Sequence, residues 1–125
     1  MPRTVLVVED EPNIVESLSF LMKKAGFVVR VARDGDSAMR TIESEIPDLI
    51  LLDIMMPRRD GYEVCRAIRA NPDWQDVRII MLSAKGREID RRKGLELGAD
   101  DYITKPFSTR EIVARVHEIL GTKAD

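Results

Sequence analysis

The 125-residue sequence is poor in the features that mark several special classes of protein. Cys65 is its only cysteine, so no disulfide can form within the chain, and this residue is interpreted as a small core residue. No apolar run approaches the roughly 20 residues of a membrane-spanning helix, and no signal-peptide pattern precedes the apolar run 5–8. These absences exclude a disulfide within the chain and a membrane-spanning helix, and they predict a protein of the reducing cytoplasm.

The sequence also lacks a strong charge of either sign. Its formal net charge is −2 and its pI is about 5.5, so it has no broad attraction for phosphate backbones or anionic lipid. We therefore expect no direct nucleic-acid partner and no membrane partner. The length and composition fit one globular domain over residues 1–125. Residues 121–125 are interpreted as a tail, or as the start of a linker to a C-terminal effector domain.

Short apolar runs alternate with helical patterns five times along the chain. The runs 5–8 and 49–52 are apolar at every position, which is typical of central strands buried on both faces of a parallel sheet. The pattern predicts an α/β fold with helices on both faces of a parallel sheet. The expected strands are residues 4–8, 27–31, 49–52, 78–82 and 101–103.

The expected helices begin or end at residues that commonly cap helices. These residues are Pro12, Gly26, Asp34, Asp60, Ser108 and Gly121. The weakest pattern covers residues 87–97, where the apolar positions form no clean stripe and Gly94 costs about 1 kcal/mol in a helix interior. We expect a marginal, mobile helix there.

Reactive side chains follow four of the five expected strands. Ligands of such sheets bind beyond the carboxyl ends of the strands, so these side chains should converge. They are Glu9, Asp10, Asp53, Ser83 and Lys105. Three converging carboxylates repel one another unless a cation neutralises them, and oxygen ligands without histidine or cysteine favour a hard ion such as Mg²⁺. Lys105 would supply the remaining positive charge.

This set suits phosphoryl transfer to a carboxylate. Asp53, beside a metal and a lysine, can act as the nucleophile because the reaction needs mostly alignment and neutralisation of the phosphoryl oxygens. Phosphorylation would add negative charge and attract the nearest donors. Ser83 has a short side chain, so its backbone would have to move. The loop after the fourth strand is therefore the predicted moving part.

These residues, together with the segments 53–61, 81–84 and 105–107, closely resemble the receiver domains of bacterial response regulators. The resemblance covers nearly the whole chain. It implies a single flavodoxin-like (βα)5 domain with sheet order 2-1-3-4-5 and helices on both faces. It also implies a two-component signalling domain rather than an enzyme. A sensor histidine kinase would phosphorylate it, and the domain would catalyse its own phosphorylation and slow dephosphorylation.

The resemblance also assigns roles to individual positions. The implied phosphoacceptor is Asp53, and the implied Mg²⁺ ligands are Glu9, Asp10, Asp53 and the backbone carbonyl of Met55. Contacts to the phosphoryl group are implied for Lys105, the Ser83 hydroxyl and the Ala84 backbone. Tyr102 matches the aromatic residue that turns inward once the hydroxyl has moved, and Lys105–Pro106 is expected to be cis. Met55 and Lys85 match positions that tune the phosphoryl lifetime. Glu9 and Ser83 replace the commoner Asp and Thr without changing the chemistry.

Other residues have alternative interpretations. Asp60, Pro57 and Gly61 are explained by helix capping and turn geometry alone. His117 is expected to be exposed on the last helix, without a metal or phosphotransfer role. A group of opposite charges near the C-terminus resembles the homodimer face of receivers of the winged-helix transcription-factor class, although a solvated face would look the same. These charges are Arg91, Asp100, Asp101, Glu111 and Arg115.

Three rival functions use similar residues. A phosphatase of the haloacid dehalogenase type would need an Asp-x-Asp motif after the first strand, where this chain has Glu9-Asp10-Glu11-Pro12. A flavodoxin-like FMN binder would need a phosphate-cradling loop at the same place, where acids would repel phosphate. A degenerate receiver would have lost an acid, the acceptor or the lysine, and none is missing. The sequence therefore favours a functional receiver.

Overall fold

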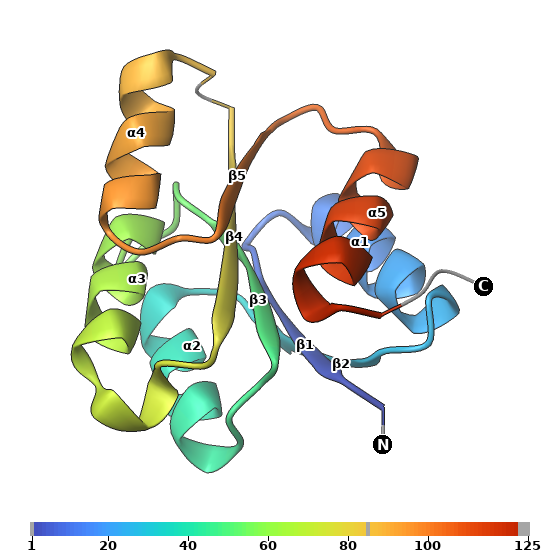
Figure 1. Cartoon of the computed structure of the whole chain (residues 1–125), viewed down its shortest axis with the longest axis horizontal. Helices are drawn as coiled ribbons and strands as arrows, with labels where there is room; N and C mark the ends of the chain where they lie inside the picture. Colours follow the sequence, from blue (N-terminus) through green and yellow to red (C-terminus); the bar gives the residue numbers. More distant parts are fainter. Residues whose placement is uncertain (1, 85, 123–125) are drawn as a thin grey trace.

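The computed structural model describes residues 2–84 and 86–122, over which strands and helices alternate along the chain (Figure 1). The strands are β1 (Thr4–Val8), β2 (Val28–Ala32), β3 (Leu49–Asp53), β4 (Arg78–Ser83) and β5 (Asp101–Thr104). The helices are α1 (Pro12–Lys24), α2 (Gly35–Ser44), α3 (Gly61–Ala70), α4 (Glu88–Glu96) and α5 (Thr109–Leu120), with a short 3-10 helix η1 (Pro72–Trp74) before β4. None of the described helices is both long enough and apolar enough to span a membrane.

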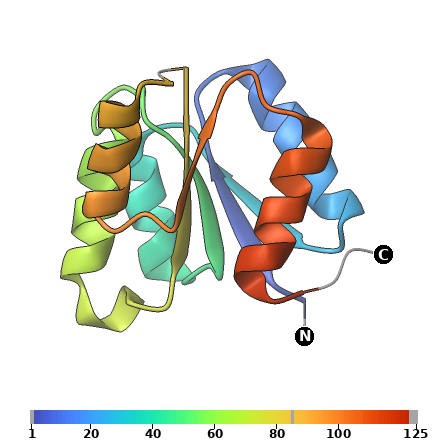
Figure 2. The ribbon, with the colours of Figure 1, turned by 45° about the horizontal axis from the view of Figure 1, so that its top comes forward.

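The five strands form one parallel sheet in the order β2-β1-β3-β4-β5. Helices α1 and α5 cover one face, and α2, α3 and α4 cover the other (Figures 1 and 2). This arrangement confirms the predicted flavodoxin-like fold and strand order. It also brings the carboxyl ends of β1, β3 and β4 side by side, because Val8 pairs with Leu52 and Asp53 pairs with Leu82.

The sheet separates two apolar cores. In β3, Ile50 and Leu52 belong to the core under α2 and α3, while Leu49 and Leu51 belong to the core under α1 and α5. All four side chains have no exposed surface. Burial on both faces explains why residues 49–52 of this strand are all apolar, since alternate residues point to opposite faces.

The ends of α2, α3 and α5 follow the predicted capping residues, whereas α1 is capped by Glu11 and α4 has no side-chain cap. Asp34, Asp60 and Ser108 each accept a hydrogen bond from the backbone N–H three residues later, and Gly121 ends α5 in the left-handed conformation with φ of 68°. Strand β2 begins one residue later than predicted, because the Phe27 N–H bonds to the Met22 carbonyl at the end of α1. The predicted tail lies partly outside the described residues, which stop at 122.

Gly94 in α4 has a packing role that its sequence context did not reveal. A Cβ atom at this position would lie 2.9 Å from Met81 Sδ and 3.1 Å from Tyr102 Cδ2. Gly94 is also the buried residue of α4, so a glycine lets this polar helix approach the sheet. The predicted helix is confirmed over Glu88–Glu96, and its mobility stays a prediction.

The prediction that His117 is exposed was wrong. Its side chain is 6% exposed, its ring centroid lies 5.1 Å from that of Phe27, and its Nδ1 lies 2.7 Å from Thr122 Oγ1. His117 lies four residues after Val113 and three before Leu120, both of which pack in the core under α5. It therefore belongs to the apolar face of the helix.

Candidate functional site

The Glu9 carboxylate is held in place by the turn that follows β1. The Glu9 N–H bonds to the Ala32 carbonyl, which joins the turn to the end of β2. Glu9 Oε2 accepts hydrogen bonds from the N–H groups of Asp10 and Glu11 at 3.1 and 3.2 Å. This leaves Glu9 Oε1 to interact across the sheet. The side chain is buried although it is charged, with 1% of its surface exposed.

Lys105 links the ends of β1 and β3. Its Nζ lies 2.7 Å from Glu9 Oε1 and 3.1 Å from Asp53 Oδ1. Its backbone N–H bonds to the Ser83 carbonyl at 2.7 Å, which joins the chain after β5 to the end of β4. The Lys105–Pro106 bond is cis, as predicted. The predicted convergence of Glu9, Asp53 and Lys105 is therefore present in the structure.

The electrostatics of this cluster shift the pKa values of two of its members. Burial raises the pKa of Asp53, repulsion by Glu9 raises it further, and Lys105 lowers it, leaving a value of about 6 instead of 3.8. For Lys105, burial lowers the pKa, but its hydrogen bond to Glu9 and the negative charge of Asp53 outweigh that effect and raise it. Lys105 alone therefore does not fully compensate the negative charge of Asp53, and a second cation would stabilise the ionised carboxylate.

The donor set fits Mg²⁺. Glu9, Asp10 and Asp53 each offer a carboxylate oxygen, and the three oxygens lie within 4.8 Å of one another. Two ligands of one Mg²⁺ ion, each about 2.1 Å from the metal, lie roughly 3–4 Å apart, so small side-chain movements suffice. The exposed Asp10 gives a route from solvent. Met55 lies two residues beyond Asp53 in the β3–α3 loop, and its side chain is 60% exposed.

The two predicted switch residues are buried in β4 and β5. Ser83 ends β4 and has no exposed surface, while the next residue, Ala84, is exposed. Tyr102 pairs with Met81 in the sheet and is 3% exposed, so its ring occupies an inward position in this structure. The roles of these three residues stay predictions. Lys85 lies outside the described residues.

Gly61 has a structural role that turn geometry does not explain. A Cβ atom there would lie 2.6 Å from the Asp53 carbonyl oxygen and 2.8 Å from Ile54 Cα. The Gly61 N–H also bonds to the Ile54 carbonyl. The first turn of α3 therefore packs directly on the backbone of the candidate acceptor, and a glycine permits this approach.

Most of the charges predicted to form a dimer face are used within the chain. The Asp100 carboxylate lies 3.1 Å from Arg69 and 3.3 Å from Arg78, and it accepts a hydrogen bond from the Ile79 N–H. Asp101 forms an ion pair with Arg115. Arg91 donates to the Tyr102 carbonyl at 3.3 Å. These contacts join α3, α4, α5 and the sheet.

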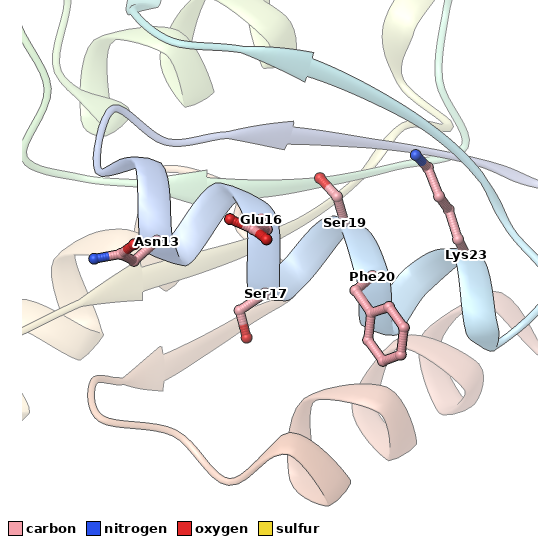
Figure 3. Close-up of a pocket in the computed structure, with 6 residues that line it drawn as sticks. All are labelled: Asn13, Glu16, Ser17, Ser19, Phe20 and Lys23. Carbon is pink, nitrogen blue, oxygen red and sulfur yellow. The ribbon is translucent and has the colours of Figure 1, made fainter.

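A hollow of about 630 Å³ lies on the outer surface of α1, away from the acid cluster, and Asn13, Glu16, Phe20 and Lys23 are among its lining residues (Figure 3). All of its lining residues come from this one helix, so it is a shallow depression of the helix surface.

The chain is similar to known proteins over almost its whole length. A family model described as the response regulator receiver domain matches residues 5–117. The crystal structure of a Chloroflexus aurantiacus protein described as a response regulator has a TM-score of 0.92 and 37% identity to this chain. The match covers 97% of this chain and 99% of that one.

Two further structures are receiver domains of histidine kinases. The domain from Syntrophus aciditrophicus is 34% identical, with a TM-score of 0.88 and coverage of 95% of this chain and 90% of that one. The domain from Pseudomonas aeruginosa is 33% identical, with a TM-score of 0.88 and coverage of 98% and 100%. The latter structure contains a magnesium ion coordinated in its active-site cleft.

Proposed function

The chain belongs to the response regulator receiver domain family, and from this premise we propose that Asp53 accepts a phosphoryl group from a sensor histidine kinase. The observation that carries the proposal is the Lys105 ammonium group placed between the Asp53 and Glu9 carboxylates. With a pKa of about 6, Asp53 is mostly ionised at neutral pH and is ready to act as a nucleophile.

In the proposed reaction, an Asp53 oxygen attacks the phosphorus atom of a phosphohistidine. A P–O bond forms, the P–N bond breaks, and its electron pair remains on the imidazole nitrogen. Mg²⁺, held by Glu9, Asp10, Asp53 and the Met55 carbonyl, would neutralise phosphoryl oxygens when bound. Lys105 stays protonated and turns from the free carboxylate to the phosphoryl group. The Ser83 hydroxyl and the Ala84 N–H would donate to its other oxygens.

The proposed output is a movement of the surface formed by α4, β5 and α5. Ser83 lies at the end of β4 and Tyr102 lies beneath α4, so a shift at the first residue would change the packing under that helix. A C-terminal effector domain, such as one that controls transcription, or a partner protein would respond to this change. The whole system would operate in the cytoplasm.

Phosphorylation should label Asp53 alone. A small-molecule phosphodonor with Mg²⁺ is expected to add one phosphoryl group to the wild type and none to Asp53→Asn, measured as a mass increase of the intact protein. Asp60→Asn is the matched control, because asparagine also caps helices and Asp60 lies seven positions after Asp53, at the end of the β3–α3 loop. It should be labelled like the wild type.

Two results would contradict this assignment in different ways. Equal labelling of the wild type and Asp53→Asn would show that another residue is the acceptor. Steady hydrolysis of a small phosphate ester that Asp53→Asn leaves unchanged would favour a hydrolase instead.

Activation is further expected to promote self-association through the face of α4, β5 and α5. Beryllofluoride with Mg²⁺ should shift the sedimentation profile of the wild type towards a dimer. Glu111→Lys, on α5, should reduce the shift, whereas Glu43→Lys, on the exposed surface of α2, should not. A wild-type profile that beryllofluoride leaves unchanged would rule out this output.

A further inference from the structure

The β3–α3 loop, residues 54–60, lies against the first turn of α2 in an unusually close contact. A Cβ atom on Gly35, the first residue of α2, would lie 2.3 Å from Arg59 Cβ and 2.4 Å from the Arg59 carbonyl oxygen. Real Cβ atoms do not approach other atoms so closely. The position therefore accepts only a glycine unless the loop moves.

Two ion pairs flank this contact. Arg59 Nε lies 3.1 Å from Asp36 Oδ1, and Arg58 Nε lies 3.9 Å from Asp34 Oδ2. Arg58 adopts a positive φ of 72°, which is uncommon for a residue other than glycine. Two consecutive arginines of the β3–α3 loop thus form ion pairs with the acids on either side of Gly35, at the start of α2. Exposed ion pairs contribute little to stability, so their main effect is on the alignment of the two segments.

The other side of the loop is fixed to the acceptor strand. Gly61 packs on the backbone of Asp53 and Ile54, and the Arg59 N–H bonds to the Pro57 carbonyl inside the loop. The loop is therefore confined between α2 on the outside and the end of β3 on the inside. Met55 lies in this confined segment, four residues before Arg59.

We propose that the contact of Gly35 and Asp36 with Arg59, here called the α2–loop contact, positions the β3–α3 loop for Mg²⁺ binding. The inference rests on the proposed function, because it assumes that Mg²⁺ binds beside Asp53. Residues of α2 do not touch the metal in this proposal. They act as positioning residues, because displacement of Arg59 would displace the loop that carries the Met55 carbonyl.

The same contact makes the start of α2 sensitive to the metal. Binding free energies at two coupled sites are reciprocal, so a contact that favours Mg²⁺ binding must itself be strengthened by Mg²⁺. Mg²⁺ bound beside Asp53 should therefore restrain the first turn of α2. Slower exchange of the backbone N–H groups of residues 36–38 would report this restraint.

Gly35→Ala tests the proposal without changing any charge. Its methyl group should push the loop away and weaken Mg²⁺ binding by about tenfold, the lower end of the loss seen when residues supporting metal ligands are altered. Ser37→Ala is the matched control, because it also places alanine in the first turn of α2 but leaves Gly35 in place. Mg²⁺ affinity is measured from amide chemical shifts during titration, and cooperative unfolding confirms that each variant folds.

Hydrogen exchange provides a second measurement that does not depend on Gly35→Ala being folded. In the wild type, Mg²⁺ should slow exchange at residues 36–38 but not in the last turn of α3, at the opposite end of the sheet. Wild-type affinity in Gly35→Ala, or exchange at residues 36–38 that Mg²⁺ does not change, would overturn the inference and leave the proposed function intact. Failure of the wild type to bind Mg²⁺ at all would instead overturn the metal site and the inference with it.

Discussion

Replacing Lys105 with methionine is expected to lower the free energy of unfolding by about 3–5 kcal/mol at pH 7 in the presence of a chelator. The Lys105 ammonium group lies 2.7 Å from Glu9 and 3.1 Å from Asp53, and both carboxylates are almost fully buried. Methionine keeps much of the apolar stem but leaves two neighbouring buried acids without their cation. The loss is measured by chemical denaturation.

Three comparisons separate this effect from a simple loss of packing. Lys23→Met, on the exposed surface of α1, should change the stability by no more than about 0.5 kcal/mol. Adding Asp53→Asn to Lys105→Met should restore much of the loss, because one of the unpaired charges disappears. Mg²⁺ should also stabilise Lys105→Met. A loss below about 1 kcal/mol would show that solvent, and not Lys105, compensates the two acids.

Replacing Asp53 with asparagine is expected to stabilise the protein at neutral pH. The pKa of Asp53 rises from 3.8 to about 6 on folding, chiefly because the carboxyl group is buried. Between these values the folded state binds more protons than the unfolded state, so this group makes stability fall as the pH rises from about 4 to 6. At pH 7, the free energy of unfolding of Asp53→Asn should exceed that of the wild type by on the order of 2–3 kcal/mol.

The pH dependence of the difference is the decisive feature. Below pH 4 the wild-type carboxyl group is neutral, so the variant and the wild type should be almost equally stable. The difference in free energy of unfolding should appear near pH 5 and reach its full size above pH 6. Asp76→Asn removes an exposed acid and should give no such difference. A difference between Asp53→Asn and the wild type that does not vary with pH would contradict the raised pKa. All samples contain a chelator, since Mg²⁺ would stabilise the charged form.

The fold and the centre of the site could be predicted because their signals are local. Apolar runs identified the strands, helical patterns and capping residues identified the helices, and parallel strands bring their carboxyl ends to one edge of the sheet. Glu9, Asp53 and Lys105 therefore met as expected, although they are far apart in the sequence. The order of the strands came from the resemblance to receiver domains.

The contacts of three glycines could not be predicted, because each depends on a distant segment. Gly35, Gly61 and Gly94 all have ordinary backbone conformations, and each is required only because another part of the chain lies against it. His117 is a different case. Its spacing from Val113 and Leu120 indicated burial, but the polar character of histidine led to the opposite prediction.

The contact of Lys105 with Glu9 and Asp53 exists only when distant parts of the chain have come together. Lys105 and Glu9 are separated by 96 positions, and strands β3 and β4 must be in place between them. During synthesis on the ribosome, the site therefore cannot form until residue 105 has emerged and β5 has joined the sheet. Under the proposed function, phosphorylation that depends on Lys105 would be confined to domains that have completed folding.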